Sequence, residues 1–263
     1  MIVLGLTLQA VYHQALRGTQ GLLTSVLQLM GQGHLPVPDY TTLCRRRATL
    51  FVELPRFRTG DAVHLVVDST GCKIYGEGEW KVRQHGWSKH RTWRKLHIGM
   101  DEAGGEILAA VLTGNEVADS ARVPELLQQV PEALEAFLGD GAYDKRCCYA
   151  ALQEREREQG QPIQVTIPPR HGARIWQHGN CRGEPLARDE NVRWIRQVGR
   201  SGWKEDSGYH RRSLVETMMF RLKTIFGEKL GARRLDSQAT EARIRCRALN
   251  IMTGLGMPQS SPL

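Results

Sequence analysis

The sequence predicts an α/β fold in which a mixed five-stranded sheet with flanking helices follows a small all-helical region. Two observations favour this fold class. Residues 1–50 show helical periodicity alone, whereas residues 60–170 alternate short apolar, β-branched runs with longer stretches of helical periodicity. No internal repeat or low-complexity tract interrupts this order. The chain of 263 residues is therefore divided into a helical region, 1–58, and an α/β domain, 59–263.

Three helices are predicted in the helical region. Apolar residues recur at helical spacing over residues 4–15 and 22–30, and Thr19 is expected to cap the second of these helices. Asp39 is expected to cap a third helix over residues 40–50. This third helix carries three consecutive arginines: Arg45, Arg46 and Arg47. A compact helical unit that ends in a basic helix is typical of helix-turn-helix DNA readers. The alternative is a structural helical cap with a solvated basic turn.

Five strands and four helices are predicted in the α/β domain. The strands are expected at residues 64–67, 94–100, 107–112, 136–139 and 163–167. The helices are expected at residues 119–130, capped by Asp119, at 143–158, stopped by Gly160, and at about 209–226 and 237–253. A long Gly- and Arg-rich connection without a predicted element follows the fifth strand.

Basic residues are distributed unevenly along the chain. The formal net charge is +8 and the isoelectric point is about 9.4. Residues 71–100 contain seven Lys or Arg and two Glu, and residues 201–250 contain eleven basic and six acidic residues, whereas residues 101–140 contain one basic and nine acidic residues. One DNA-facing surface and one solvent-facing surface would produce this pattern, although a merely basic protein is the alternative. Four side chains of the first basic segment are expected to contact DNA: Lys89, Arg91, Arg94 and Lys95.

The cysteine pattern and the hydropathy predict a cytoplasmic protein with no membrane partner. No pair among the six cysteines has CxxC spacing, and the chain is not cysteine-dense, so reduced thiols are expected. No apolar run reaches the length of a membrane span. The apolar start lacks the basic segment and the cleavage site of a signal peptide.

Two aspartates each follow a short apolar strand directly. Asp68 comes after the first predicted strand and Asp140 after the fourth, in the settings DSTG and GDGAYD. Ligands of α/β sheets gather at the carboxyl ends of strands, so both carboxylates could share one site. An Asp after a strand is also a common turn-former, and for either residue alone the turn is favoured. The occurrence of two such residues makes a shared site more plausible.

A further polar feature lies on the helix predicted at residues 209–226. At about 100° per residue, four polar side chains fall on one narrow stripe: Tyr209, Arg212, Glu216 and Lys223. Four apolar side chains fall on the opposite face: Leu214, Met218, Leu222 and Ile225. Packing through the apolar face would present the four polar groups together. The periodicity alone fits equally a solvated face with helix-spaced charge pairs.

The spacing Tyr-x2-Arg-x3-Glu-x6-Lys resembles the signature of bacterial insertion-sequence transposases of the DDE class. Four further segments resemble the branch named after insertion sequence five: LPVPDYTTLCRR (35–46), VVDSTGCKIYGEGEW (66–80), WRKLHIGMD (93–101) and GDGAYD (139–144). These motifs occur in the family's order over nearly the whole chain. The order of the predicted elements is also that of the ribonuclease-H-like fold.

The resemblance implies a ribonuclease-H-like catalytic domain with a catalytic and metal-binding triad: Asp68, Asp140 and Glu216. Two Mg²⁺ ions, which Mn²⁺ can replace, are the implied cofactors for DNA strand cleavage and strand transfer. Three further residues are expected to contact DNA phosphates: Tyr209, Arg212 and Lys223. The expected partners are double-stranded DNA, both terminal inverted repeats and target, and a second copy of the chain in a DNA-bound homodimer.

Proteins of this family usually carry a further N-terminal segment, and Met1 falls inside what resembles the start of the DNA-binding region. The helical region is therefore expected to be truncated at its N-terminus. Two other functions stay open: a non-catalytic DNA-binding remnant or repurposed transposase product, and a structure-selective nuclease of the same fold. Metal-dependent nicking separates the enzyme from the remnant, and strand-transfer products separate the transposase from the nuclease.

Overall fold

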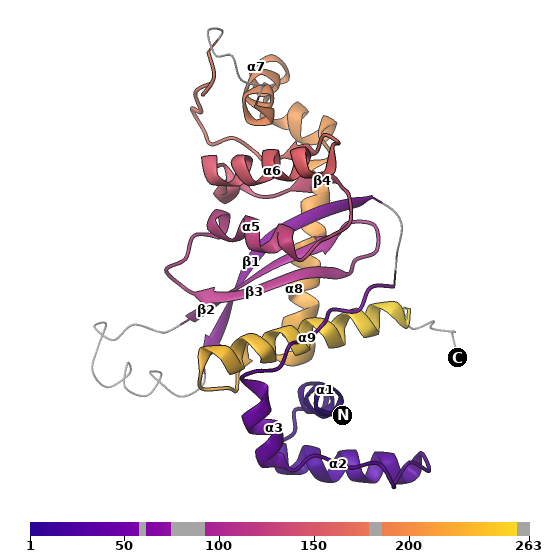
Figure 1. The fold of residues 1–263 in the computed structure, drawn as a ribbon. Coiled ribbons are helices and arrows are strands. Elements are labelled where there is room, and N and C mark those ends of the chain that lie inside the picture. Colours follow the sequence, from indigo (N-terminus) through magenta and orange to yellow (C-terminus); the bar gives the residue numbers. More distant parts are fainter. Residues whose placement is uncertain (58–61, 75–92, 179–185, 257–263) are drawn as a thin grey trace, which may run out of the picture.

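A central sheet lies between helices on both of its faces (Figure 1). The computed structural model describes residues 1–57, 62–74, 93–178 and 186–256. The strands are β1 (Val63–Ile74), β2 (Trp93–Asp101), β3 (Ile107–Gly114), β4 (Leu134–Leu138), β5 (Gln164–Thr166) and β6 (Lys229–Leu230). The α-helices are α1 (Ile2–Tyr12), α2 (Leu16–Leu29), α3 (Tyr40–Arg47), α5 (Val123–Gln128), α6 (Arg146–Gln159), α7 (Ala187–Asp206), α8 (Ser213–Phe226) and α9 (Leu235–Gly254). Three 3-10 helices join them: η1 (Asp119–Arg122), η2 (Gly141–Tyr143) and η3 (Tyr209–Arg212).

β1 is the central strand of a mixed six-stranded sheet. The order is β3-β2-β1-β4-β5, and β6 pairs with the far end of β1. β2 is antiparallel to β1 and β3, whereas β4 runs parallel to both β1 and β5. This arrangement confirms the predicted mixed α/β fold with flanking helices, of the ribonuclease-H-like kind. The two-residue strand β6 is an addition that the sequence did not predict.

β1 is longer than predicted. It does not end at Asp68 but continues to Ile74. Residues 65–73 pair one by one with β2, whereas the pairing of β1 with β4 ends at Val66 and that with β6 begins at Lys73. Asp68 therefore lies inside a strand, where it pairs with Ile98 of β2 on one side.

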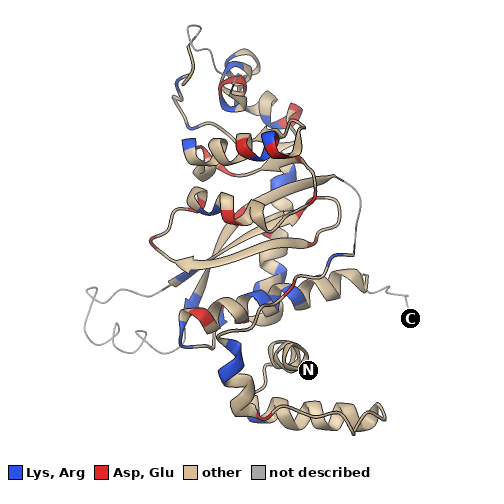
Figure 2. Cartoon of the chain, in the orientation of Figure 1, with Lys and Arg blue, Asp and Glu red and all other residues tan. Residues whose placement is uncertain are grey.

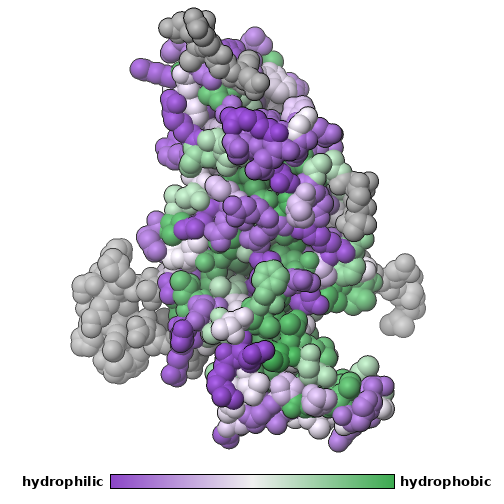
Figure 3. All heavy atoms as spheres, viewed as in Figure 1, coloured by the Kyte–Doolittle hydropathy of each residue, from purple (hydrophilic) through white to green (hydrophobic). Residues whose placement is uncertain are grey.

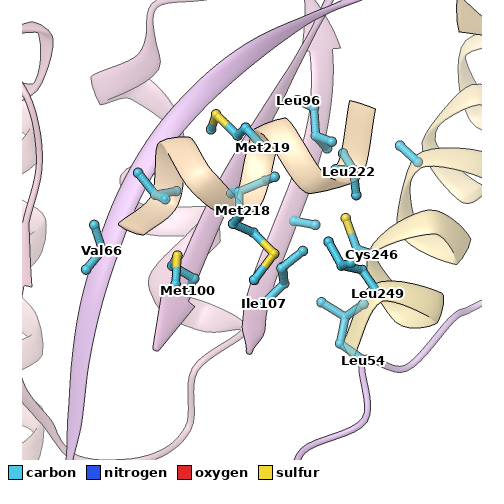
Figure 4. Packing of buried hydrophobic residues seen from close by; sticks show 14 of the residues in the cluster. Leu54, Val66, Leu96, Met100, Ile107, Met218, Met219, Leu222, Cys246 and Leu249 are labelled. Carbon is cyan, nitrogen blue, oxygen red and sulfur yellow. The ribbon is translucent and has the colours of Figure 1, made fainter. Parts of the chain in front are cut away.

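Alternate residues of β1 enter two separate cores. Val66 belongs to the core under α8 and α9, whereas Leu65 and Val67 belong to the core under α5 and α6. Figure 4 shows the first core, in which Met218 and Leu222 of α8 point toward the sheet. Fully burying one such side chain contributes about 1.5–3 kcal/mol, so this core holds α8 firmly on its face of the sheet.

The N-terminal helices pack against α9 rather than standing apart. Leu6 of α1, Leu43 of α3 and Ile244 of α9 share a third small core. Asp39 caps α3 as predicted, since its carboxylate accepts a hydrogen bond from the Thr41 backbone N–H at 2.8 Å. α3 ends at Arg47, which is shorter than the range expected. The division of the chain at residue 58 stays a prediction.

The predicted role of Thr19 as a helix cap is wrong. α2 begins earlier, with Ala15 in the capping position. Thr19 is fully buried inside α2, and its hydroxyl donates to the Ala15 carbonyl at 3.1 Å. A threonine hydroxyl can bond the carbonyl one turn back, so a cap and an interior position are not distinguished by residue type alone.

Several predicted helices begin later than expected because their first residues form 3-10 turns. Asp119 opens η1 without a capping hydrogen bond from its side chain, and α5 follows with Pro124 in its first turn. Residues 141–143 form η2, so α6 begins only at Arg146. Gly160 ends α6 as predicted, in the left-handed region with φ 69° that glycine adopts without strain.

α7 occupies the stretch that was expected to be an irregular connection. Most of its buried residues are polar, namely Arg188, Asp189 and Asn191, so an apolar period was not visible. Gly199, with φ 79° and ψ 166°, interrupts the helix by a kink. α7 and the N-terminal helices lie at opposite ends of the molecule (Figure 1).

Hydrophilic side chains cover most of α6 and its neighbourhood, whereas hydrophobic ones reach the surface near the junction of the N-terminal helices with α9 (Figure 3). In the part of the chain that the structure describes, no helix is both long and apolar enough to cross a bilayer.

Candidate active site

The parallel register of β1 and β4 brings two aspartates to one edge of the sheet. Val66 and Leu138 are the last paired residues of these strands. Asp68 and Asp140 each lie two residues further, so both continue the pleat that faces α8. The Asp68 carboxylate accepts a hydrogen bond from the Ser69 backbone N–H at 2.7 Å. The Asp140 carboxylate accepts one from the Ala142 backbone N–H at 2.8 Å, which fixes the turn into η2.

Arg212 joins Asp68 to the helix that carries Glu216. Its guanidinium donates to Asp68 Oδ2 at 2.8 Å and also to Glu216 Oε1. The side chains of Arg212 and Asp68 are 19% and 18% exposed, and that of Glu216 is 54% exposed. The cluster is therefore open to solvent and to ligands on the Glu216 side.

All three candidate carboxylates affect the pKa of the Arg212 guanidinium. Burial lowers the pKa of the guanidinium, but Tyr209, Asp68, Glu216 and Asp140 together raise it above its ordinary value. Burial also raises the pKa of the Asp68 carboxyl, which the Ser69 N–H and Arg212 lower and Asp140 raises further. Three carboxylates thus lie close enough to one guanidinium to influence it, and two of them influence each other.

A buried contact behind the site holds Tyr209. The Tyr209 ring packs on Trp203 of α7, with 5.7 Å between the ring centres. Trp203 is fully buried and donates from Nε1 to Asn191 Oδ1 at 3.0 Å, and Asn191 donates to the Val165 carbonyl of β5 at 2.9 Å. Burial raises the pKa of the Tyr209 hydroxyl. Sequence reasoning missed this support, although two tryptophans spaced nine residues apart in 187–206 were a signal for a packed helix.

Gly139 permits close packing beneath the turn that carries Asp140. A Cβ at this position would lie 3.0 Å from the Tyr143 ring and 3.3 Å from Val67. The Tyr143 hydroxyl is buried and has no hydrogen-bond partner among the described residues. Burial raises the pKa of this hydroxyl, and Asp68, Asp119 and Asp140 raise it further. A neutral phenol therefore lies behind the two aspartates.

The helix that supplies Glu216 differs in detail from the prediction. Tyr209–Arg212 form the 3-10 helix η3, and α8 begins at Ser213, so the four polar residues are not on one continuous α-helix. The packed face of α8 is formed by Val215, Met218, Met219, Leu222 and Phe226. Leu214, expected on that face, is 40% exposed, and Ile225 is only partly buried. At about 100° per residue the buried residues of α8 span an arc at whose margin Leu214 falls, which explains the error.

Lys223 lies further along α8 than the carboxylates. Seven residues separate it from Glu216, a rise of about 10 Å. It is near the end of β1, because its charge contributes to lowering the pKa of Glu228, whose largest influence is a hydrogen bond from Lys73. Lys223 therefore belongs to the same side of the sheet but not to the carboxylate cluster.

The other residues predicted to contact DNA have diverse surroundings. Arg45 and Arg46 are exposed. Arg47 is 9% exposed, donates to Gln9 and lies 3.9 Å from Glu241, so its guanidinium serves the packing of α3 and is removed from the expected DNA surface.

Two residues of β2 also have partners within the protein. Arg94 donates to Gln238 Oε1 at 2.9 Å, and Lys95 donates to the Val117 carbonyl at 2.9 Å and lies 3.3 Å from Asp119. Lys89 and Arg91 lie outside the described residues.

The donor set at the sheet edge suits a hard divalent cation. All three candidate ligands are carboxylates, which Mg²⁺ and Mn²⁺ prefer over nitrogen or sulfur. In this conformation the Arg212 guanidinium lies between the Asp68 and Glu216 carboxylates. Among the described residues, no three His, Cys, Asp or Glu side chains are arranged closely enough to hold a metal ion. Shared binding of an ion by these carboxylates would therefore require their side chains to move from this conformation.

Comparison with known protein families agrees with this geometry. A family model described as "Transposase DDE domain" matches residues 59–251, which include all three carboxylates, and a second model with the same description matches residues 1–77. No solved structure matches the chain. Because the first match covers most of the sequence, the chain belongs to the DDE transposase family.

Proposed function

We propose that this protein is the transposase of an insertion sequence, of the branch named after insertion sequence five, and that it cleaves DNA strands and joins them to target DNA. Asp68, Asp140 and Glu216 are its catalytic residues. The observation that carries this proposal is that Arg212 pairs with Asp68 of β1 and Glu216 of α8 at a solvent-accessible site, while Asp140, at the end of β4, is near enough to raise the pKa of the same guanidinium.

The three carboxylates would hold two Mg²⁺ ions, or Mn²⁺ in their place. Such ions, when bound, activate the attacking water or 3′-hydroxyl and stabilise the leaving oxygen. Arg212 balances the negative charge of the carboxylates before DNA binds and can then present its planar fork to a phosphate. Tyr209, whose ring packs on Trp203, would donate its hydroxyl to the same strand. Lys223 supplies a further positive charge about 10 Å along the helix.

The substrates that follow from this function are the terminal inverted repeats and a target duplex. A homodimer on DNA would place one carboxylate cluster at each repeat. The cytoplasm, where the chain is bound to the nucleoid, is the compartment that fits a DNA substrate and reduced thiols. The exposed arginines Arg45 and Arg46 of α3 are the contacts we propose for the helical region.

One experiment tests the proposal directly. The purified protein is incubated with Mg²⁺ and a duplex that carries the repeats flanking its gene, and both 3′-end cleavage and strand-transfer products are measured. Glu216→Gln keeps the size of the side chain but removes its charge. Cleavage should fall by more than ~100-fold, since even the outer partners of metal ligands contribute about 10- to 100-fold. DNA affinity, which comes mainly from basic residues, should persist.

Glu158→Gln is the matched control, because Glu158 is similarly exposed but lies on α6. It should cleave at the parent rate. If Glu216→Gln also cleaves at the parent rate, the assignment of the carboxylates is wrong. Binding without cleavage by the parent would indicate a DNA-binding remnant, and cleavage without strand transfer would indicate a nuclease.

A further inference from the structure

A cleft of about 1270 Å³ lies between the N-terminal helices and the segment that joins α8 to α9. One wall is formed by residues of α1 and α3, including Gln9 and Arg45. The other wall is formed by the end of β1, by β6 and by the start of α9, including Lys73, Lys229 and Arg233. None of the three candidate catalytic carboxylates lines it.

The cleft and the carboxylates are connected by two structural elements. α8 carries Glu216 near its start and reaches the cleft at Phe226, a rise of about 15 Å. β1 carries Asp68 and reaches the cleft at Lys73, about 16 Å further along the strand. The cleft therefore lies about 15 Å along α8 from Glu216 and about 16 Å along β1 from Asp68.

The lining of the cleft is strongly basic. Seven of its residues are Lys or Arg and two are Glu. Both glutamates are already engaged, Glu228 with Lys73 at 2.6 Å and Glu241 with Arg245 at 2.7 Å. Glu241 also accepts hydrogen bonds from the backbone N–H groups of Gly231 and Ala232. Arg47 also lies 3.9 Å from Glu241, and Arg234 pairs with Asp236 at 2.7 Å, so four of the seven cations have an acidic partner and three do not, within the described residues.

Three exposed cations face this cleft without an acidic partner. For Arg45, Lys229 and Arg233, the described part of the chain offers no carboxylate within 4.0 Å. Figure 2 shows Lys and Arg on α3 and in the middle of α9, and the sequence adds Arg233 and Arg234 directly before α9. A concave surface lined by charges of one sign concentrates the potential and attracts a polyanion.

We propose that this cleft is a second DNA-contact site, which binds the phosphate backbone of the same duplex whose strand enters the carboxylate site. The proposal rests on the proposed function. A separation of about 15 Å corresponds to about four to five nucleotides along one strand, at 3.4 Å each. Lys223 lies on α8 between Arg212 and the cleft, so a basic track links the two sites. The N-terminal helices, packed on α9, then contribute to substrate binding as one wall of the cleft.

The test compares DNA binding by the parent protein with that of the double variant Lys229→Gln/Arg233→Gln. Both side chains are exposed, so the fold should be kept, and thermal unfolding checks this. A duplex that extends two helical turns from the cut is titrated at several salt concentrations. Loss of two phosphate contacts should lower the salt slope by roughly two units and weaken binding roughly tenfold or more.

The matched control is Arg157→Gln/Arg193→Gln, which removes the same charge from exposed positions on α6 and α7. It should keep the parent slope. Arg45→Gln, on the opposite wall, should lower the slope by about one unit. An unchanged slope in both cleft variants, or equal losses in the control, overturns the proposal. So does a loss that is confined to single-stranded DNA or RNA.

The outcomes separate the cleft from the catalytic assignment. If the cleft variants bind like the parent while Glu216→Gln abolishes cleavage, only the cleft inference fails. If the parent does not cleave but the slopes change as expected, the proposed function fails and the DNA-contact site stands.

Discussion

Two clusters in this protein have the same composition, one arginine between two carboxylates, but differ in their access to water. Arg188 contacts Asp144 at 2.7 Å and Asp189 at 3.2 Å, and the three side chains are 4%, 2% and 1% exposed. Arg212 contacts Asp68 and Glu216, with side chains 19%, 18% and 54% exposed. The charged groups are of the same types, so the difference between the clusters must come from their surroundings.

The buried cluster has its hydrogen bonds satisfied by the protein. Asp144 also accepts from the Arg170 backbone N–H, and Asp189 accepts from the backbone N–H groups of Trp176 and Gln177. The Arg188 guanidinium lies 3.8 Å from the centre of the Trp176 ring. Such a network fixes α7 and residues 168–178 on α6 and offers nothing to a ligand.

The cluster around Arg212 is less complete. Among the described residues, Asp68 has the Ser69 N–H and Arg212 as its hydrogen-bond partners, and Glu216 has Arg212. A third carboxylate, Asp140, is near enough to influence Arg212. Carboxylates with few fixed partners can exchange a guanidinium for another cation. The comparison teaches that solvent access, rather than charge type, separates a structural ion cluster from one available for chemistry.

The largest stability effect expected from this comparison is that of Arg188→Met. Removing one partner of a buried ion pair leaves an uncompensated charge and costs about 3–5 kcal/mol of unfolding free energy. Arg212→Met should cost about 1 kcal/mol, because water can solvate the remaining carboxylates. Urea unfolding of both variants measures the difference. Similar losses in the two variants would show that both clusters are structural.

His97, on the face of the sheet opposite to α8, is a buried titratable group whose effect on stability depends on pH. His97 is fully buried, with Nε2 at 2.8 Å from Thr113 Oγ1 and Nδ1 at 3.4 Å from Asp119. Burial lowers its pKa from 6.5 to about 4. Because the folded-state pKa is lower than that of the unfolded chain, His97 contributes its full stability above about pH 6.5 and loses it as the pH falls toward 4. The loss should reach roughly 3 kcal/mol.

The pH effect is measured as the change in urea midpoint between neutral pH and pH 4. His97→Gln removes the titration and should flatten the profile in this window. His64→Gln, which makes the same substitution at a histidine whose side chain is 34% exposed, is the matched control. If the parent and the His97→Gln variant lose the same stability between neutral pH and pH 4, His97 is not the source of the acid sensitivity.

The sequence predicted those parts of the site that depend on local pattern. Asp68 and Asp140 were predicted as site residues because each directly follows a short apolar run, and the parallel pairing of β1 with β4 places both just beyond the last paired residues. Glu216 was predicted from the polar stripe and from the resemblance. Apart from the resemblance, each of these signals lies in the residues of one strand end or one helix.

The remaining features depend on packing between distant elements. α7 was missed because its buried residues are polar and find their partners elsewhere in the chain, as Asn191 does at Val165. The three arginines of α3 look alike in sequence, yet Arg47 alone is buried. Its position four residues after the buried Leu43, on the same helical face, was a signal that could have separated it from its neighbours.

The smallest effect expected is the coupling between Arg212 and Glu216. The two residues are four apart along the chain, and the glutamate is 54% exposed. Pairs at this spacing contribute about 0.3–0.5 kcal/mol, and Arg212 keeps Asp68 and Asp140 as neighbours when Glu216 is changed. A double-mutant cycle with Arg212→Met and Glu216→Gln, followed by urea unfolding, should therefore give a coupling below about 1 kcal/mol that disappears at ~1 M salt, where screening acts over about 3 Å.

The same cycle with Arg188→Met and Asp144→Asn should give a larger coupling that salt leaves nearly unchanged, because water and ions do not reach the buried pair. A salt-resistant coupling of several kcal/mol at Arg212 would mean that its carboxylates are held as tightly as those of Arg188, which is incompatible with their release to bind a metal ion.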